Sequence, residues 1–425
     1  MLFIYNLLLP FMLIIFLPGL IWKLIHRGGW KKTFSERFGI YSAQRKAELM
    51  QFRSAVWIHA VSVGETVVAL SFINAYHKHA PEKRFILSTG TTTGQALARE
   101  KAPEYCRVIF CPLDCYFTVR HVLNLLKPAE LLIFETELWP NLIYQAHRRK
   151  IKLALLNGRL SDHSIKGYYR FRCFFRPLLA QFDLIAAQSQ GDAERFKTIS
   201  PQAGIHATGN LKFDQKVDPK LPAVDYSEYF ADHDALVLTG ASTHNPEEEL
   251  IAKTFLKLKA EFPHLKLVLV PRHAERGSEI ASMLKQNNIS FSRRSQELRA
   301  NNPVDCLLAD TTGEMMKLLK GSDIVIMGKS LAGQSGGHNL LEPALLGKAI
   351  VCGKELTNFR FIMDALKNKQ ALLVAETDNN LYDQLKKIIS DPALRQQLGK
   401  NALAAAGEHS GAADKILTLL DKIKK

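Results

Sequence analysis

Cysteine is scarce in this sequence, and its spacing does not fit a metal site. The six cysteines, at positions 106, 111, 115, 173, 306 and 352, include no Cys-x-x-Cys pair. Cys111 and Cys115 lie four positions apart, but no second Cys or His pair follows at the spacing of a zinc site. We therefore expect reduced, mostly buried thiols, as in a cytoplasmic catalytic protein, and no metal site.

Common phosphate-binding signatures are also missing. The glycine-rich stretch Gly328–Gly347 is neither GxGxxG nor a P-loop, so this stretch alone excludes neither nucleotide nor sugar binding. The single Asp-x-Asp, Asp232-His233-Asp234, precedes an expected strand. Ligands of open α/β sheets bind beyond the carboxyl ends of the strands, so this motif lies at the wrong end for a metal–nucleotide site. Short-period repeats and low-complexity tracts are absent.

Acidic residues are too few to balance the basic ones. The chain has 56 Lys and Arg against 41 Asp and Glu, a formal charge of +15 that points to an anionic partner. Nucleic acid, anionic lipid and a phosphorylated substrate all fit that charge. The excess is concentrated in residues 23–53 and 148–176, beside hydrophobic or aromatic residues. This placement favours a membrane surface, and we expect no nucleic-acid partner.

Only the amino terminus carries an apolar run of about the length that spans a bilayer, residues 2–22. No positive segment precedes this run and no small-residue cleavage site follows it, which argues against a removable signal peptide. Basic residues follow at once, so the positive-inside rule leaves the rest of the chain in the cytoplasm. Pro10 and Pro18-Gly19 would kink a helix, so an interfacial anchor stays an alternative, as does a buried helix of a soluble protein.

The remaining sequence alternates short apolar runs with amphipathic stretches, and at 425 residues it is too long for one core. Such alternation predicts parallel sheets with helices on both faces. The expected strands are Ala55–Val61, Phe85–Thr89, Arg107–Phe110, Leu131–Phe134, Leu153–Leu156, Leu184–Ala187, Ile205–Thr208, Ala235–Leu238, Leu265–Val270, Cys306–Leu308, Ile324–Met327, Ile350–Cys352 and Leu372–Val374. The predicted parts are a membrane anchor (1–25), a first α/β domain (26–212), a linker with two prolines (213–230), a second α/β domain (231–405) and a C-terminal helix (406–425).

Carboxylates follow the first and fourth expected strands. Glu65 opens a helical stretch, where the helix dipole alone would favour a carboxylate. The functional interpretation is a general base, whose pKa must be raised by burial or by a neighbouring carboxylate. Glu135 and Glu137 are two residues apart in extended chain and share one face, so they form a cluster.

Basic residues in the first half suit an anionic partner at a lipid surface. Lys212 lies at the junction with the linker, where it could offset developing negative charge or be an ordinary surface lysine. Arginines alternate with aromatic residues over 166–176, a pattern that suits the lipid headgroup layer better than stacked bases. The residues that we expect at this anionic or membrane surface are Arg159, Lys166, Arg170, Arg172 and Arg176.

In the second half, the glycine-rich stretch follows an apolar strand, and a helical pattern opens at His338 and continues to Leu346. Strand, glycine turn and helix start together suit a phosphate, although a plain βα turn would also need glycine. Arg272 ends another strand, and its planar guanidinium matches phosphate oxygens. Glu314 and Glu342 could accept hydrogen bonds from a ribose or a base, or simply be helix N-terminal charges.

Taken together, these residues resemble one family over nearly the whole chain: the 3-deoxy-D-manno-octulosonic acid (Kdo) transferases of lipopolysaccharide assembly. Besides the N-terminal anchor, the matching segments are Val63-Gly64-Glu65, FETELWP at 134–140, NGRLS at 157–161, GNLKFD at 209–214, PRH at 271–273 and GGHNLLEP at 336–343. Their order and their placement in the two domains make the resemblance specific, although no single motif would suffice.

The resemblance implies a GT-B fold, in which two Rossmann-like doubly wound domains face a cleft. It implies an inverting, metal-independent glycosyltransferase without a cofactor, which moves Kdo from CMP-Kdo to a lipid A precursor, lipid IVA. The second domain would hold the donor, and the first would meet this phosphorylated glycolipid at the cytoplasmic face of the inner membrane.

By matching positions, the resemblance implies that Glu65 is the general base and that Glu135 and Lys212 stabilise the transition state. The implied CMP- or donor-binding positions are Arg272, His273, Gly313, Glu314, Met315, Ser335, Gly336, Gly337, Asn339, Leu340, Leu341 and Glu342. Three positions differ from the family pattern: Ala274 and Leu340 stand where proline is expected or frequent, and Lys329 stands where a second glycine is common. Lys329 therefore places a side chain beside the expected phosphate loop.

Three other functions were weighed against this one. A GT-B transferase with a different nucleotide sugar would be distinguished by competition between CMP and UDP or GDP. A non-catalytic membrane-bound lectin or scaffold needs no base, so Glu65, Glu135 and Glu137 argue against it. A nucleic-acid-binding protein fits least, because the positive charge is concentrated near an apolar anchor.

Overall fold

The computed structural model describes residues 2–11, 35–201, 204–232, 234–300 and 302–423. The chain forms two compact units, each built on its own parallel sheet. Unit 1 comprises Met1–Gln215 and His409–Lys425, and unit 2 comprises Lys216–Glu408. The chain therefore passes between the units twice, and its last segment belongs to unit 1.

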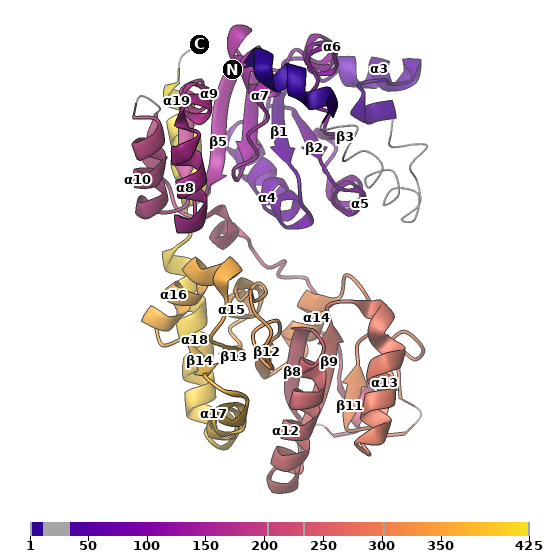
Figure 1. Cartoon of the computed structure of the whole chain (residues 1–425). Helices are drawn as coiled ribbons and strands as arrows, with labels where there is room; N and C mark the ends of the chain where they lie inside the picture. The colour runs from indigo at the N-terminus through magenta and orange to yellow at the C-terminus, as the bar shows by residue number, and fades with distance from the viewer. Residues whose placement is uncertain (1, 12–34, 202–203, 233, 301, 424–425) are drawn as a thin grey trace. The chain divides into compact units, whose positions relative to one another are not determined.

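Unit 1 contains a seven-stranded sheet in which every pairing is parallel (Figure 1). The spatial order is β3-β2-β1-β4-β5-β6-β7. The strands are β1 (Val56–Ala60), β2 (Phe85–Thr89), β3 (Cys106–Phe110), β4 (Glu130–Phe134), β5 (Lys152–Gly158), β6 (Leu184–Ala187) and β7 (Ile205–Ala207). Strand order reverses between β1 and β4, and this is where an open α/β sheet forms its binding crevice.

Helices cover both faces of this sheet, because the strands are apolar on both faces. Trp57 packs into one core while its neighbours Val56 and Ile58 pack into the other, as the alternation of strand side chains requires. The helices of unit 1 are α3 (Ala43–Met50), α4 (Val63–His79), α5 (Thr92–Lys101), α6 (Tyr116–Leu126), α7 (Pro140–Arg148), α8 (Asp162–Arg170), α9 (Arg172–Leu179), α10 (Gln190–Ile199), the 3₁₀ turn η1 (Leu211–Asp214) and α19 (Ala412–Lys422).

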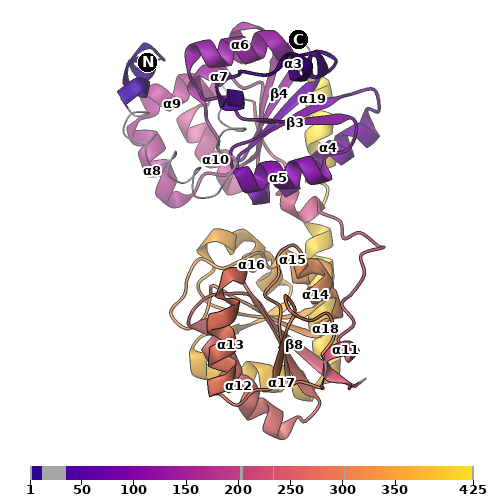
Figure 2. The same cartoon turned by 90° about the vertical axis from the view of Figure 1, so that its right-hand side faces the viewer.

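The last helix, α19, completes the core of unit 1. Ile416, Leu417 and Leu420 are buried with residues of α4 and with strand residues such as Phe134. In Figures 1 and 2 the yellow α19 lies among the indigo and magenta elements of this unit. The carboxylate of Asp214 accepts hydrogen bonds from the backbone N–H groups of Gly411 and Ala413, so η1 and α19 are held together.

Unit 2 has a second seven-stranded parallel sheet, ordered β10-β11-β9-β8-β12-β13-β14. The strands are β8 (Leu236–Thr243), β9 (Leu265–Pro271), β10 (Phe291–Arg293), β11 (Cys306–Leu308), β12 (Ile324–Met327), β13 (Ala349–Gly353) and β14 (Leu372–Ala375). Here the order reverses between β8 and β12.

Helices again cover both faces of the sheet of unit 2 (Figure 2). One core lies under α12, α13, α17 and α18, and a smaller one lies under α11 and α14. The helices are α11 (Ser227–Phe230), α12 (Glu247–Glu261), the 3₁₀ turn η2 (Ala274–Arg276), α13 (Gly277–Gln286), α14 (Met315–Gly321), α15 (Leu341–Leu345), the 3₁₀ turn η3 (Thr357–Phe359), α16 (Arg360–Asn368), α17 (Asp378–Ser390) and α18 (Pro392–Glu408).

The predicted α/β class, with two doubly wound parallel sheets, is confirmed. All of the predicted strands are present, but the three-residue edge strand β10 was not predicted, since it is too short to show a period. Strand β8 continues to Thr243, five residues beyond its predicted end at Leu238. Among the described cysteines, Cys173 is exposed, Cys115 is half-buried and the other four are buried.

The predicted N-terminal anchor lies partly outside the described residues. Residues 2–11 are helical, and residues 12–22 are not described. Within the described residues, no helix has the length and apolar character needed to cross a bilayer. The helix over 2–11 is attached to unit 1 by Tyr5, whose hydroxyl donates to Asp114 (2.9 Å), and by reciprocal amide bonds between Asn6 and Asn141.

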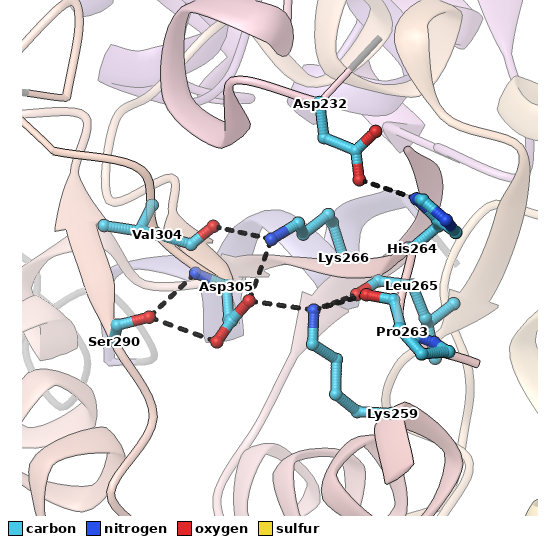
Figure 3. A network of polar contacts seen from close by, with 9 residues as sticks. All are labelled: Asp232, Lys259, Pro263, His264, Leu265, Lys266, Ser290, Val304 and Asp305. Carbon is cyan, nitrogen blue, oxygen red and sulfur yellow. Dashed lines mark hydrogen bonds and ion pairs between the residues drawn. The ribbon is translucent and has the colours of Figure 1, made fainter. Parts of the chain in front are cut away.

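A polar network ties the amino ends of the unit 2 strands together (Figure 3). Lys259 and Lys266 both contact Oδ1 of Asp305 at 2.8 Å. Asp232, from the single Asp-x-Asp, contacts Nδ1 of His264 at 3.1 Å in the turn before β9. The prediction that this motif precedes a strand is therefore confirmed. The Asp232 carboxylate lies at the amino ends of the strands, whereas the glycine-rich stretch follows the carboxyl end of β12.

Candidate active site

In unit 1, the sheet topology brings the predicted carboxylates to one place. Strands β1 and β4 are neighbours, and their carboxyl ends lead into Val61–Glu65 and Glu135–Glu137. Since these ends meet at the reversal of strand order, the carboxylates lie at the point where α/β sheets bind ligands.

Glu65 is held at the start of α4 by two local hydrogen bonds. Ser62 caps the helix by accepting from the Glu65 N–H (3.2 Å), and Oε2 of Glu65 accepts from the Val61 N–H (2.8 Å). Its other oxygen, Oε1, accepts no hydrogen bond within the described part of the chain. The side chain is only 8% exposed. Glu65 therefore has a fixed orientation and one oxygen with which to accept a proton.

Burial raises the pKa of Glu65, and the nearby charge of Glu135 adds to that rise. The hydrogen bonds from Ser62 and Val61 oppose it, because they favour the ionised form. Both conditions stated for a base near neutrality, burial and a neighbouring carboxylate, are thus present.

Glu135 and Glu137 extend the cluster. Glu135 takes a left-handed backbone conformation (φ 56°), and its carboxylate pairs with Nζ of Lys212 at 3.1 Å. Burial, together with the charges of Glu65 and Glu135, raises the pKa of Glu137 to about 7. Glu137 was predicted to belong to the cluster, but no role was assigned to it. Three coupled carboxylates and one lysine therefore share this end of unit 1.

Two asparagines from the predicted motifs position Lys212. Oδ1 of Asn157, at the end of β5, accepts from the Leu211 N–H (3.0 Å), and Oδ1 of Asn210 accepts from the Lys212 N–H (3.0 Å). Asn157 is 1% exposed and has φ 56°. Through these bonds the segments NGRLS and GNLKFD hold the lysine beside Glu135.

A pocket of about 350 Å³ opens beside this cluster. Its lining combines Glu135 and Glu137 with Arg159, Ser161 and Tyr168. Burial raises the pKa of the Tyr168 hydroxyl, and the charge of Glu137 raises it further. Carboxylate, guanidinium and hydroxyl groups therefore line one pocket beside the cluster.

The remaining predicted basic residues lie on two consecutive helices of unit 1. Lys166 and Arg170 belong to α8, and Arg172 and Arg176 belong to α9; all four are exposed. Arg172 lies 4.9 Å from the centre of the Tyr169 ring. Sequence reasoning therefore grouped these residues correctly on one part of the surface.

In unit 2, the reversal of strand order lies between β8 and β12, and two segments meet there. Strand β8 leads into His244, and β12 leads into the glycine-rich stretch at Gly328. The two segments are joined by Glu247, a fully buried carboxylate in the first turn of α12.

Glu247 accepts hydrogen bonds from four backbone N–H groups. Oε2 accepts from His244 (2.9 Å) and Lys329 (2.7 Å), and Oε1 accepts from Ser330 (2.9 Å) and Leu331 (3.0 Å). Because every donor is backbone, this one side chain fixes the course of the chain after β12. Sequence reasoning missed Glu247; the run Glu247–Glu249 carries the ordinary signature of acidic residues at a helix start.

The backbone of the glycine-rich stretch is left-handed at several positions. Gly337 has φ 69°, and a Cβ there would lie 2.6 Å from Leu356 Cγ, so glycine is required. Lys329 has φ 60°, a left-handed conformation that glycine would adopt without strain. The loop thus exposes irregular backbone at the carboxyl end of β12.

The helix predicted from His338 is shorter than expected. Helix α15 begins at Leu341, three residues later, and ends at Leu345. Pro343 accounts for the difference, because proline is tolerated in the first helical turn but not further inside. Asn339 instead lies ahead of the helix, where its Oδ1 accepts from the Leu341 N–H (3.2 Å) and its amide approaches Glu342 Oε1 (3.3 Å). The predicted helix start at His338 is therefore wrong, and the role of a helix N-terminus near Gly336–Asn339 in binding a phosphate stays a prediction.

Basic side chains gather around this loop. Arg272 follows β9 and is exposed, and among the described residues its guanidinium has no hydrogen bond or ion pair. His273 is exposed beside it, and Nε2 of His244 lies 2.9 Å from Nε2 of His338. His244 was missed because β8 was predicted to end at Leu238, so this histidine was not recognised as a strand-end residue.

The remaining donor-site predictions have mixed outcomes. Glu314 is bound by both nitrogens of the Arg294 fork (3.0 and 2.8 Å), and hydrogen bonds from Arg294 hold its pKa below the ordinary range. Its carboxylate is therefore already occupied, whereas Gly313 (φ 83°) is an open turn.

Glu342 has a pKa that burial raises, and the charge of Arg272 partly offsets this rise. Ser335 is exposed, and Gly336 and Leu340 are buried.

No group of three His, Cys, Asp or Glu side chains is arranged to hold a metal ion within the ranges that the structure describes. Metal independence stays a prediction.

Sequence comparison places both halves of the chain in known families. Residues 32–215 match the family described as 3-Deoxy-D-manno-octulosonic-acid transferase (kdotransferase), and residues 235–404 match Glycosyl transferases group 1. A 3-deoxy-D-manno-octulosonic acid transferase of Haemophilus influenzae is 32% identical over 92% of this chain and 91% of the relative. The protein of that name from Rickettsia felis is 31% identical over 80% of this chain and 72% of the relative.

Solved structures share the fold at low identity. A UDP-GlcNAc 2-epimerase from Neisseria meningitidis, bound to UDP-GlcNAc, has a TM-score of 0.59 at 14% identity, and covers 87% of this chain and all of its own. A glycosyltransferase from Rickettsia africae has a TM-score of 0.56 at 10% identity, and covers 88% of this chain and all of its own. These similarities show a GT-B-like α/β fold.

Proposed function

The chain belongs to the family of 3-deoxy-D-manno-octulosonic acid transferases and is a glycosyltransferase, and we propose that it moves Kdo from CMP-Kdo to the lipid A precursor lipid IVA. The product would enter lipopolysaccharide assembly. The observation that carries this proposal is the coupled cluster of Glu65, Glu135, Glu137 and Lys212 at the carboxyl ends of the unit 1 strands. A sugar-binding protein without activity has no use for such a cluster.

Glu65 is the base in the proposed mechanism. An acceptor hydroxyl has a pKa far above neutrality, so its proton must pass to a carboxylate as the new C–O bond forms. Oε1 of Glu65 accepts that proton, while Oε2 stays bound to the Val61 N–H. Attack opposite the departing phosphate inverts the sugar centre, which becomes oxocarbenium-like as its bond to the phosphate oxygen breaks. Lys212, held by Glu135, offsets negative charge beside the base.

Unit 2 holds the donor in this proposal. The departing CMP keeps the electron pair of the broken bond, so negative charge grows on its phosphate. Arg272, with no partner among the described side chains, and the backbone of the Gly328–Gly337 loop supply positive charge and N–H groups for it, without a metal. In this proposal the half-buried carboxyl of Glu342 accepts hydrogen bonds from ribose hydroxyls.

We also propose that unit 1 works at the cytoplasmic face of the inner membrane. The helix over residues 2–11 exposes more than half of each of five apolar side chains: Phe3, Ile4, Leu7, Leu8 and Phe11. Helices α8 and α9 add exposed basic residues, with Tyr169 and Phe171 exposed beside them. Apolar, aromatic and basic side chains in one unit suit the headgroup layer. Release from membranes by high salt alone would contradict the anchor.

One experiment tests donor, acceptor and reaction together. Purified protein is incubated with CMP-Kdo and a tetraacylated lipid A precursor, and the lipid product is analysed by mass spectrometry. We expect addition of Kdo, with inhibition by CMP but not by UDP or GDP. Inhibition by UDP or GDP instead would support the alternative, a membrane-associated GT-B transferase that uses another nucleotide sugar.

The donor role of Arg272 has its own test. Arg272→Ala removes the guanidinium, so donor affinity should fall far more than acceptor affinity, and titrations with CMP and with the lipid measure the two. Equal losses for donor and acceptor would contradict the phosphate role.

A further inference from the structure

Two histidines in unit 2 meet through their ring nitrogens. The rings of His244 and His338 are nearly coplanar (12°), their centres are 5.1 Å apart and their Nε2 atoms are 2.9 Å apart. This geometry is an edge-to-edge N–H···N hydrogen bond. The two residues follow different strands, since His244 succeeds β8 and His338 belongs to the loop after β12.

Such a bond determines the tautomers. One ring must carry its proton on Nε2 to donate, and the other must leave Nε2 bare to accept. The accepting ring then has its proton on Nδ1, and the donating ring has a bare Nδ1 when the pair is neutral. Among the described residues, neither Nδ1 atom has a hydrogen-bond partner.

The surroundings keep the pair neutral when no anion is near. Burial lowers the pKa of His338 to about 4, and the charges of Arg272, His244, Lys329 and His273 add to the effect. Burial and the charges of Lys329 and His273 also lower the pKa of His244; Arg276 acts in the same direction and Glu248 opposes them. Most of these groups are cationic. The carboxylate of Glu247 also lies near the pair, where it accepts from the backbone N–H of His244 (2.9 Å) and three other backbone N–H groups.

An anion reverses this balance. Placed among Arg272, Lys329 and the two rings, an anion offsets the positive charges that disfavour protonation. One added proton on the bare Nδ1 produces an imidazolium that keeps the Nε2···Nε2 bond, which becomes charge-assisted and stronger. Both outer Nδ1–H groups are then donors.

We propose that the His244–His338 pair is a proton-binding anion site, in which an anion at the carboxyl ends of β8 and β12 binds together with one proton shared by the two rings. Only the identity of that anion, the phosphate of CMP, rests on the proposed function. The Nε2···Nε2 bond joins the charged ring to the neutral one, so the two histidines act as one unit.

The pair should make anion binding depend on pH. Sulfate is a suitable probe, because it does not titrate between pH 6 and 8 and any dependence belongs to the protein. Uptake of one proton makes sulfate binding up to about tenfold tighter for each unit by which the pH falls, until the pair is protonated without the anion. Isothermal titration in two buffers of different ionisation enthalpy counts the protons.

Matched variants assign the protons to the pair. His244→Gln and His338→Gln should each abolish most of the proton uptake and flatten the pH dependence of sulfate binding, with little loss of affinity at pH 8. His264→Gln is the control, because this histidine contacts Asp232 at the opposite end of the sheet and should leave both quantities unchanged.

Each outcome decides between the two proposals. Sulfate that binds without proton uptake, or with uptake that survives both variants, overturns the role of the pair, and CMP that still binds then leaves the donor assignment intact. Sulfate that binds with proton uptake lost in both variants, when CMP does not bind, overturns the donor and supports the pair. Sulfate and CMP that both fail to bind overturn both proposals.

Discussion

At the scale of single residues, the carboxylates of unit 1 differ in how they are held. Glu65 has one oxygen occupied by backbone, Glu135 is paired with Lys212, and burial with nearby charge raises the pKa of Glu137 to about 7. A base must be ionised to act, and Glu65 helps to raise the pKa of Glu137, so the two titrate as a coupled pair. The acid limb of the pH–rate profile should report that pair.

Glu65→Gln should abolish transfer in a folded protein. Loss of a positioned base costs about 10²–10⁴-fold in rate, and the decrease should appear in kcat. Circular dichroism checks folding, and Glu100→Gln, an exposed carboxyl on α5, serves as the control. Near-normal turnover in Glu65→Gln would refute the assignment.

Glu137→Gln should change the profile near pH 7 instead. Glu65 is already ionised when Glu137 titrates, because the charge of Glu65 is one of the causes that raise the pKa of Glu137 to about 7. Above that pH the charge of Glu137 makes Glu65 a stronger base, so wild-type kcat/KM should show an inflection near pH 7 that the variant lacks. The same inflection in the variant would show that Glu137 is not coupled to the base.

Lys329 is a strained position with a useful charge. Its φ of 60° costs a non-glycine residue about 1–2 kcal/mol in the folded state. Glycine removes this strain, but it also increases the conformational entropy of the unfolded chain, which cancels about half of the gain in stability. Lys329→Gly should raise the free energy of unfolding by up to about 1 kcal/mol in chemical denaturation, and should weaken CMP binding. Lys329→Ala separates the effects: it loses the charge but keeps the strain, so it should weaken CMP equally without stabilisation.

At the scale of elements, the loop after β12 depends on one buried side chain. Glu247→Gln keeps the shape but leaves a single acceptor oxygen and a misplaced NH₂ for four backbone donors. We expect a loss of stability of about 2–3 kcal/mol in chemical denaturation, and faster hydrogen exchange at residues 329–331. Glu249→Gln, half-exposed two residues later, should change stability by less than about 0.5 kcal/mol.

The elements also show what could be predicted from the residues alone. Strand runs such as Phe85–Thr89 and Ile324–Met327 were found at their observed bounds, because buried parallel strands are uninterrupted apolar segments. The position of Glu65 at a helix start followed from the same pattern. The last five residues of β8 are small or polar, so the apolar pattern did not extend to them. The end of the strand was therefore placed too early, and His244 was not recognised as a residue that follows it.

Contacts between distant segments could not be predicted. The bond from Lys329 to Glu247 joins residues 82 positions apart, and that from His244 to His338 spans 94. No local period reports such pairs. The start of α15 is different, because Pro343 was visible and its constraint on the helix could have been applied.

At the scale of the whole molecule, the last helix belongs to the first unit. Leu417→Ala should cost unit 1 about 2–5 kcal/mol, because Leu417 is 2% exposed in its core. Hydrogen exchange with mass spectrometry should show faster exchange in peptides of unit 1 and little change in unit 2. Thr418→Ala, one position later and exposed, is the control; equal acceleration in both units would contradict the division of the chain.

The return of α19 to unit 1 has a consequence for biosynthesis. A ribosome releases residues 216–408 before residues 409–425, so the second unit has its complete sequence while the first still lacks a core helix. Unit 1, which is translated first, is therefore the last to complete its core. The carboxylate of Asp214, two residues after Lys212, can accept its hydrogen bonds only after Gly411 and Ala413 have been synthesised. A nascent chain interrupted just after residue 408 would carry unit 2 with its complete sequence, whereas unit 1, without a core helix, would be open to chaperones and proteases.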